Sequence, residues 1–379
     1  MSDTKSKLNI AMFGHKRVPS REGGVEIVVE ELSSRMVSNG HFVTCYNRKG
    51  HHVSDKSFDV KNIKEHKGVK IKSVLTIDKK GLAAVTSSFF AAVRCAFSKY
   101  DVVHIHAEGP AAMAPILKLF NKRVIVTVHC LDWQRDKWSE GFAKKYIKFG
   151  EKMAVKYADE IIVLSKRVQK YFKDAYNRET VYIPNAVNMP DILSADEIAE
   201  KYSLEKDGYL LFLGRLVPEK GVHHLIQAFK KVQSDKRLVI VGGASDTDDY
   251  VKELLNLARD DSRIIFTGFA QGRLLSELYS NAYVYVLPSL LEGMPLSLLE
   301  ALSYKNCCVV SDIEECKEVV EDKAFVVKAG DVDALYNTLQ KLCDDKALVD
   351  KYKETAQEFV LKKYNWDDVA KKTLALYEK

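Results

Sequence analysis

Short apolar runs, each followed by a polar loop and a stretch with helical periodicity, recur along the whole chain. The hydrophobicity of each run is continuous rather than alternating, which is typical of parallel strands buried on both faces of a sheet. With helices between them, the first expected at Val25–Met36, they predict an α/β fold of two doubly wound, Rossmann-like domains. The runs are Leu8–Phe13, Phe42–Tyr46, Val69–Leu75, Val102–Ile105, Val124–Val128, Glu160–Leu164, Tyr209–Leu213, Arg237–Val241, Arg263–Phe266, Tyr283–Leu287, Cys307–Val310 and Ala324–Val327.

The segment from Pro184 to Pro190 separates the two series of strands and holds two of the chain's eight prolines. We interpret it as a linker, which assigns residues 1–187 to the first domain and starts the second at residue 188. A length of 379 residues suits two domains, each with its own core and with a cleft between them.

No apolar run reaches the ~18–20 residues that a membrane-spanning helix requires. The stretch MSDTKSKLNI lacks the apolar core of a signal peptide, and the seven cysteines stand at irregular spacings typical of reduced thiols. The expected location is the cytoplasm.

Charge is divided unequally between the halves. Residues 1–187 hold 33 Lys and Arg against 19 Asp and Glu, a net charge of +14, whereas residues 188–379 hold 25 against 33, a net charge of −8. The basic half is therefore expected to meet an anionic membrane surface or a phosphorylated substrate, unless its lysines are simply solvated. Nucleic acid is disfavoured because no recognition motif accompanies the charge. One helix could lie on anionic lipid through Lys144, Lys145, Lys148, Lys152 and Lys156.

Polar residues that follow strands of an open parallel sheet are the first candidates for function, since ligands bind at the carboxyl ends. Gly23 and Gly24 precede the first helix, where close backbone approach and free N–H groups favour an anion such as phosphate. The alternative is a plain turn. The loop is not GxGxxG, so a nicotinamide cofactor is disfavoured.

Three histidines, His104, His106 and His129, also stand at strand ends, where imidazoles suit hydroxyl contacts and proton handling. A zinc site is disfavoured on the expectation that His104 and His106 point to opposite faces of their strand. The acidic stretch Asp246–Asp249 is expected to cap a helix rather than to bind a metal.

In the second half, Arg215 and Lys220 follow the first strand, and these cations suit a diphosphate. Glu292 lies in the loop before a helix that Pro295 is expected to begin, and Glu300 lies inside that helix. Carboxylates can accept hydrogen bonds from the vicinal hydroxyls of ribose or a hexose. Each of these residues could alternatively be an ordinary surface charge.

Together these features strongly resemble the retaining GT-B glycosyltransferases of family four, over essentially the whole chain. The most specific elements are GRLVPEKG at 214–221 and NAYVYVLPSLLEGMPLSLLEALS at 281–303, with FTGF at 266–269 and IPNAV at 183–187 as further landmarks. The strings VPSREGGVEIVVEEL and VTVHCLDWQRDKW are similar to bacterial rhamnosyltransferases of polysaccharide assembly.

The resemblance implies a role for each candidate residue. Glu300 would bind ribose hydroxyls, Phe269 would flank the base, Arg215 and Lys220 would hold the diphosphate, and His129 would touch the sugar near the reacting centre. Glu292, with the backbone of Gly293, Met294, Pro295 and Leu296, would contact the transferred sugar, and Gly23 and Gly24 would close over the phosphates. The acceptor would lie near His15, Arg17, His106, Glu108 and Asp132.

The resemblance further implies that residues 363–379 form a helix that crosses back to the first domain, which limits the second to 188–362. The donor would be a UDP- or dTDP-sugar and the acceptor a glycan, expected to be lipid-linked, in bacterial surface polysaccharide synthesis at the inner face of the plasma membrane. No metal or other cofactor is expected. Two alternatives stay open: a nucleotide-sugar 2-epimerase on the same fold, and a catalytically silent nucleotide-sugar-binding module.

Overall fold

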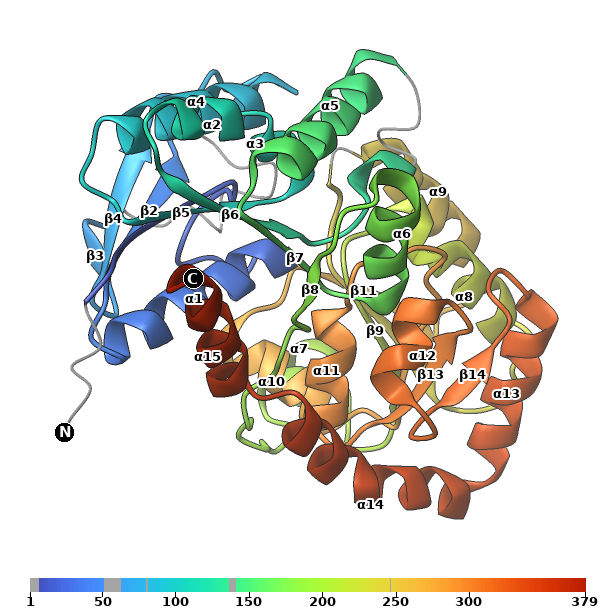
Figure 1. Cartoon of the computed structure of the whole chain (residues 1–379). Helices are drawn as coiled ribbons and strands as arrows, with labels where there is room; N and C mark the ends of the chain where they lie inside the picture. The colour runs from blue at the N-terminus through green and yellow to red at the C-terminus, as the bar shows by residue number, and fades with distance from the viewer. Residues whose placement is uncertain (1–6, 51–62, 80, 136–140, 246) are drawn as a thin grey trace. The chain divides into compact units, whose positions relative to one another are not determined.

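The computed structural model describes residues 7–50, 63–79, 81–135, 141–245 and 247–379. The chain divides into two compact units (Figure 1): the first contains residues up to Asn185 together with Trp366–Lys379, and the second is Ala186–Asn365. The boundaries expected from the sequence lay at 187/188 and 362/363. Among the described helices, none is both long enough and apolar enough to cross a bilayer.

The first unit is built on an eight-stranded sheet with the order β3-β4-β2-β1-β5-β6-β7-β8. Among the strands in the described residues, only β3 pairs antiparallel, and the continuous apolar runs of the sequence form the parallel strands. The strands are β1 (Asn9–Phe13), β2 (Phe42–Arg48), β3 (Glu65–His66), β4 (Val69–Val74), β5 (Val102–His106), β6 (Arg123–Val128), β7 (Glu160–Val163) and β8 (Val181–Tyr182).

Helices cover both faces of this sheet (Figure 1). Contacts among α2, α3, α4 and α5 form a layer on one face, and α1 packs with α15 on the other. The helices are α1 (Gly24–Ser38), α2 (Leu82–Ala96), α3 (Glu108–Ala111), α4 (Ala114–Leu119), α5 (Gly141–Tyr157), α6 (Lys166–Tyr176) and α15 (Trp366–Tyr377), with a 3-10 turn, η2 (Asp132–Gln134), after β6.

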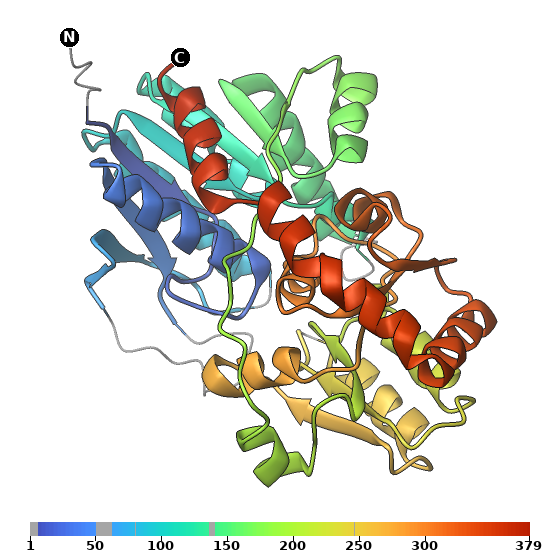
Figure 2. The ribbon, with the colours of Figure 1, turned by 90° about the horizontal axis from the view of Figure 1, so that it is seen from below.

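The last helix, α15, belongs to the first unit and runs beside α1 (Figure 2). Trp366 at its start is buried, and Arg35 of α1 donates to Asp367 at 2.8 Å. At its other end the Arg123 guanidinium donates twice to the carbonyl oxygen of Leu376, at 3.1 and 2.7 Å. The C-terminal helix is therefore tied to α1 at its start and to β6 of the sheet at its end.

The second unit is built on a parallel six-stranded sheet with the order β11-β10-β9-β12-β13-β14. Its strands are β9 (Tyr209–Leu213), β10 (Arg237–Val241), β11 (Ile264–Gly268), β12 (Val284–Leu287), β13 (Cys307–Ser311) and β14 (Phe325–Val327). Its helices are α7 (Glu197–Tyr202), α8 (Val222–Phe229), α9 (Asp248–Ala258), α10 (Gly272–Ser280), α11 (Leu296–Ser303), α12 (Glu314–Val320), α13 (Val332–Asp344) and α14 (Lys346–Lys363), and η4 (Pro218–Lys220) is a 3-10 turn.

In each sheet the strand order reverses beside the first strand of the unit. In the first unit β1 lies between β2 and β5, and in the second unit β9 lies between β10 and β12. Ligands of open α/β sheets bind outside the carboxyl ends of the strands at such a switch point. The loops that follow β1, β5, β9 and β12 are therefore the places to look for a site.

Candidate active site

Lys220 and Glu292 meet at the switch point of the second unit. Lys220 ends η4 after β9, and Gly221 follows with a φ of +66° that favours glycine. A Cβ on Gly221 would lie 2.2 Å from the carbonyl oxygen of Pro288, so the loops after β9 and β12 touch through the backbone. The absence of a side chain at Gly221 is what lets these two loops come together.

The Glu292 carboxylate is held in place by two donors. Lys220 Nζ lies 2.5 Å from Oε1, and the Ser289 hydroxyl donates to the same oxygen at 2.7 Å. Glu292 is 8% exposed. An ammonium has three N–H donors, so Lys220 can contact Glu292 and still donate to a second anion.

Glu300 is oriented by a tyrosine that sequence reasoning missed. The Tyr279 hydroxyl of α10 donates to Glu300 Oε2 at 3.1 Å, and its ring stacks on Tyr304 with centroids 5.1 Å apart. Burial raises the pKa of Tyr279 well above its ordinary value, so the hydroxyl stays a neutral donor. The helix α11 begins at Leu296, one residue later than expected, and Pro295 is its N-cap. Gly293, Met294 and Leu296 are buried.

The other donor-side candidates follow neighbouring strands. Arg215 is half-buried after β9, and Lys220 Cε lies 3.8 Å from the position of a Cβ on Gly214, so both predicted diphosphate cations flank Gly214. Phe269 follows β11, and its ring packs against Gly243, which follows β10. The structure thus brings Arg215, Lys220 and Glu292 to the switch point, with Phe269 two strands away in the sheet order.

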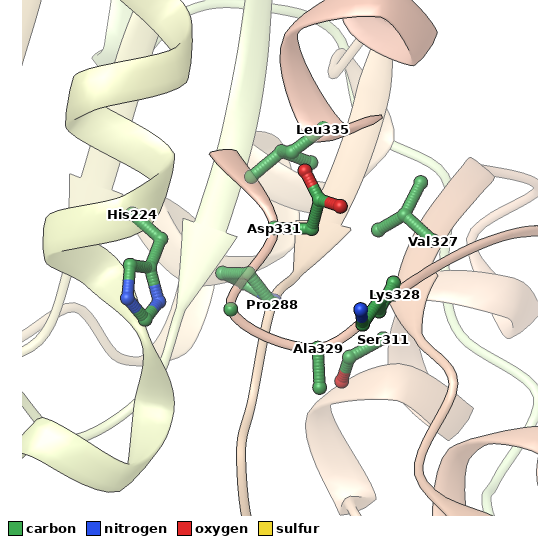
Figure 3. Close-up of a pocket in the computed structure, with 9 residues that line it drawn as sticks. His224, Pro288, Ser311, Val327, Lys328, Ala329, Asp331 and Leu335 are labelled. Atoms are coloured by element: carbon green, nitrogen blue, oxygen red, sulfur yellow. The ribbon is translucent and has the colours of Figure 1, made fainter. Parts of the chain in front are cut away.

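A small hollow lies beside Pro288, which follows β12 (Figure 3). Its empty volume is ≈ 200 Å³ even with the open solvent at its mouth included. The Ser311 hydroxyl lines the hollow and donates to the carbonyl oxygen of Ser289. The Ser289 side chain in turn contacts Glu292. It is too small for a nucleotide sugar. The hollow is lined by His224, Pro288, Ser311, Val327, Lys328, Ala329, Gly330, Asp331 and Leu335.

In the first unit, His15 follows β1 and bonds to Asn47 of β2, with His15 Nε2 3.0 Å from Asn47 Oδ1. The Asn47 amide also bonds the backbone N–H and carbonyl of Val18, at 3.0 and 2.9 Å, and so orders the loop after β1. Sequence reasoning missed Asn47. Arg17, in the same loop, donates to the carbonyl oxygen of Gly50 at 3.2 Å.

The histidines at the ends of β5 and β6 form one cluster. His106 Nδ1 lies 3.1 Å from His129 Nε2, and the rings of His104 and His106 stack with centroids 4.2 Å apart. The expectation that His104 and His106 point to opposite faces was wrong, because residues two apart on a strand share a face. Both nitrogens of His104 are engaged, Nδ1 with the Tyr377 hydroxyl at 2.6 Å and Nε2 with Thr127 Oγ1 at 2.7 Å.

These imidazoles are neutral at physiological pH. Burial lowers the pKa of His15 and His129 to about 4 and that of His104 to about 3, and it places the pKa of His106 well below the ordinary value. Neutral rings can exchange hydrogen bonds with hydroxyls but bring no positive charge to a phosphate. The arrangement therefore suits hydrogen bonds with uncharged hydroxyl groups of a ligand.

The N-terminus of α1 carries a carboxylate that was not singled out from the sequence. Glu26 Oε1 accepts the Lys16 N–H at 2.8 Å, and Oε2 would lie 2.7 Å from a Cβ on Gly23. Gly23 is the N-cap of α1, and Gly24 is the first helical residue and is exposed. The glycine loop therefore has the buried Glu26 carboxyl group at its side.

Glu108 and Asp132 meet beyond β5 and β6. Glu108 is fully buried, and its Oε2 accepts the Asp132 N–H at 2.8 Å. The side chain of Asp132 pairs with Arg135 at 3.1 Å. Glu108 thus contacts the backbone of the turn η2.

Within the described ranges, no group of three or more His, Cys, Asp or Glu side chains has the arrangement needed to hold a metal ion. In the acidic stretch considered for a metal, Asp248 and Asp249 lie in the first turn of α9, and Thr247 is its N-cap. Asp246 lies outside the described residues.

Comparisons with known proteins match both units. Residues 22–189 match the family model described as Glycosyltransferase Family 4, and residues 194–359 match the model described as Glycosyl transferases group 1. The chain is 24% identical over 392 residues to an uncharacterised glycosyltransferase of Methanocaldococcus jannaschii, with 98% of each chain covered.

Two further similarities carry chemical information about the relatives themselves. An Escherichia coli relative named UDP-Gal:alpha-D-GlcNAc-diphosphoundecaprenol alpha-1,3-galactosyltransferase is 28% identical over 267 residues, with 66% of this chain and 68% of the relative covered. The Anabaena protein HepE, solved in complex with UDP and glucose, aligns with a TM-score of 0.80 at 16% identity over 97% of this chain and 98% of its own. At that identity the structural likeness shows the fold.

Proposed function

Because the chain belongs to the family-four glycosyltransferases and has their GT-B fold, we propose that it moves a sugar, with retention of anomeric configuration, from a nucleotide diphosphate to a hydroxyl of a lipid-linked glycan. It is a glycosyltransferase that acts in the synthesis of a polysaccharide or another glycan. The observation that carries the proposal is the Lys220–Glu292 pair beside Arg215 at the switch point of the second unit.

On this proposal the second unit binds the donor. Arg215 and Lys220 hold the diphosphate, Glu292 and the backbone from Gly293 to Leu296 contact the transferred sugar, and Glu300 accepts hydrogen bonds from ribose hydroxyls. Phe269 flanks the base. The relatives named for UDP-Gal or solved with UDP support a UDP-sugar, with a dTDP-sugar as the other candidate.

The chemistry follows from charge. The bond between the anomeric carbon and the leaving phosphate oxygen breaks as the acceptor oxygen attacks from the same face. The leaving oxygen takes the acceptor's proton, so no covalent glycosyl-enzyme and no metal are required. Negative charge builds on the diphosphate, where fixed cations stabilise the transition state.

The first unit supplies the acceptor side in this proposal. His129 contacts the sugar near the reacting centre, and His15, Arg17, His106 and the segment that Glu108 joins to Asp132 face the acceptor. Neutral imidazoles are suitable because the groups to be recognised are hydroxyls.

A binding and transfer assay tests the proposal. Thermal unfolding is measured with UDP, dTDP and GDP and their sugars, since a ligand at 100 times its Kd adds about 2.7 kcal/mol. Transfer is then measured from the best donor to GlcNAc-diphosphoundecaprenol. Arg215→Ala and Lys220→Met should lower kcat by about 10²–10³, and Glu300→Gln should raise the donor KM.

The matched control is Arg259→Ala, which removes an exposed cation of the same unit that pairs with Asp260. It should leave donor binding and kcat unchanged. The absence of a shift with every nucleotide, in a protein shown to be folded, would refute the proposal. Donor turnover without acceptor would indicate the epimerase, and donor binding without transfer to any acceptor would indicate the silent module.

We propose an anionic membrane surface as a partner of the exposed side of α5, which carries aromatic and basic side chains. Phe142 is 82% and Phe149 49% exposed, and Lys145, Lys152 and Lys156 are exposed at matching helical positions. Aromatic rings beside lysines are typical of helices that lie on anionic lipid. A cytoplasmic enzyme bound to the membrane through this stripe could reach a lipid-linked acceptor.

Sedimentation with phosphatidylglycerol vesicles, compared with phosphatidylcholine vesicles, tests this membrane contact. Lys145→Glu combined with Lys152→Glu should weaken binding to the anionic vesicles at least about tenfold. Lys170→Glu, which changes an exposed lysine of α6 in the same unit, is the control. Equal binding by all variants would contradict a role for α5.

A further inference from the structure

Two carboxyl groups of the first unit are buried next to each other behind the turn η2. Glu108 begins α3, Glu151 lies in α5, and both are 0% exposed. The two helices lie side by side (Figure 1), and a Cβ on Gly150 would be 2.0 Å from the carbonyl oxygen of Glu108. Gly150 therefore lets the backbone of α5 approach that of α3 closely, beside both glutamates.

Glu151 is surrounded by hydrogen-bond donors. Its Oε2 accepts the Trp133 indole N–H at 3.0 Å. Its Oε1 accepts from the Tyr171 hydroxyl at 2.8 Å, from Lys148 Nζ at 3.1 Å and from the Tyr176 hydroxyl. Burial alone raises the pKa of Glu151, but hydrogen bonds from Glu108, the tyrosines and Lys148 outweigh it and lower the pKa. Glu151 is therefore a carboxylate.

Glu108 is in the opposite situation. Its Oε2 accepts the Asp132 N–H at 2.8 Å, whereas no N–H or O–H donor in the described part of the chain reaches the buried Oε1. Burial raises the pKa of Glu108 well above 4.5, and the charge of Asp132 and the contact with Glu151 raise it further. Two ionised carboxylates cannot hydrogen-bond to each other, so one proton is needed between them.

We propose that Glu108 and Glu151 form a carboxylic acid–carboxylate pair that positions the turn η2 for acceptor binding. Glu108 holds the backbone of the turn at Asp132, and Glu151 holds the Trp133 side chain through its indole nitrogen. The Lys148 ammonium, bound to Glu151, lies 3.6 Å from the centroid of the Trp133 ring. Glu108 and Glu151 are both positioning residues. The role of η2 in acceptor binding rests on the proposed function.

The pair makes stability depend on pH in a defined way. Glu108 holds its proton more tightly in the folded state than in the unfolded state. Its contribution to the free energy of unfolding is therefore complete below pH 4.5 and is lost as the pH rises through its raised pKa. Glu151 contributes above 4.5 and loses its contribution in acid. The titratable or charged groups facing the pair are Asp132 and Arg135 around η2, Cys130 before it, Tyr146 and Lys148 of α5, and Tyr171 and Tyr176 of α6.

Two substitutions at Glu108 distinguish the effect of its hydrogen bonds from the effect of its side-chain volume. In Glu108→Gln the amide oxygen can still accept from Asp132 and the amide N–H can donate to Glu151, as the acid does. In Glu108→Leu both hydrogen bonds are lost. Tyr146→Phe is the matched control, because the Tyr146 hydroxyl is buried nearby and has no hydrogen-bond partner among the described residues.

Urea unfolding of the full chain at a series of pH values from 5 upward is the first readout, and it does not depend on transfer. We expect wild type to lose stability as the pH rises relative to Glu108→Gln, and Glu108→Leu to be the least stable variant at pH 5. The idea is overturned if Glu108→Gln is as unstable as Glu108→Leu at pH 5, or if it retains the decline with rising pH.

The second readout is transfer to GlcNAc-diphosphoundecaprenol. Glu108→Leu should raise the acceptor KM at least tenfold with the donor KM within twofold, Glu108→Gln should restore it, and Tyr146→Phe should not change it. A parallel rise in both KM values would show a merely structural role. If wild type transfers no sugar, the proposed function fails, while the urea measurement still decides whether the pair shares a proton.

Discussion

Acid should destabilise the first unit through its buried histidines. Burial lowers the pKa of His15, His104 and His129 to about 4, about 3 and about 4, from 6.5. In the unfolded chain each histidine has its ordinary pKa of 6.5. At pH values between 6.5 and the folded-state pKa, the unfolded state therefore binds more protons than the folded state. Stability therefore falls as the pH falls below 6.5, and the loss is complete only below the folded pKa values.

The size of the effect follows from the same values. The proton uptake of one such histidine on unfolding rises from about 0.1 at pH 7.5 to almost one at pH 5, which lowers the free energy of unfolding by about 2 kcal/mol. His104→Gln should remove this share, so wild type should lose about 2 kcal/mol more than the variant over this range. Glu108 has a raised pKa, so it stabilises the folded protein as the pH falls, opposite to the histidines. The test is therefore the difference in stability between wild type and His104→Gln, and not the pH dependence of wild type alone.

Urea unfolding followed by circular dichroism at pH 7.5 and pH 5 measures this difference. The control is Thr127→Val, which removes the hydroxyl 2.7 Å from His104 Nε2 but keeps the imidazole. It should lower stability by a similar amount at both pH values. If His104→Gln loses as much stability as wild type between them, the folded ring accepts a proton and the argument from burial is refuted.

Three further predictions concern packing and the donor side. Trp366→Ala should lower the free energy of unfolding by about 3–5 kcal/mol in urea titration, because it empties a buried site at the start of α15. Gly221→Ala should weaken nucleotide binding in the thermal-shift assay, because its Cβ would overlap the loop after β12, whereas Gly40→Ala, which also has positive φ but open space, should not. Tyr279→Phe should raise the donor KM about 2–10-fold, because Glu300 loses a net hydrogen bond of about 0.5–1.5 kcal/mol.

The strands could be predicted because burial on both faces leaves a continuous apolar run. Each of the twelve expected runs overlaps a parallel strand, whereas β3 and β8 were missed because two residues such as Val181–Tyr182 make no recognisable run. The rule that ligands bind at the carboxyl ends of parallel strands also pointed to the loops that hold Lys220 and Glu292. It could not supply their 2.5 Å contact, which requires the backbone approach at Gly221.

The partners that orient the candidate residues were not predictable in the same way. Tyr279 meets Glu300 across 21 positions of sequence, and Asn47 meets His15 across 32. Neither stands in a motif or at an unusual position of its own element, and only the folded sheet brings them to the site. The neutral state of the histidines is equally invisible in the sequence, because it depends on burial.

The lysines of α5 show how a correct periodicity can still overstate a surface. Helical spacing treated all five as one basic face, but Lys148 turns inward to Glu151 and the Trp133 ring. Lys144 also lies within 6.0 Å of the Trp133 ring centroid. The energy of attraction to anionic lipid should therefore be that of three lysines, about 3 kcal/mol at about 1 kcal/mol each, and not of five. Lys148→Gln should accordingly lower stability more than it lowers vesicle binding, and Lys152→Gln should do the reverse.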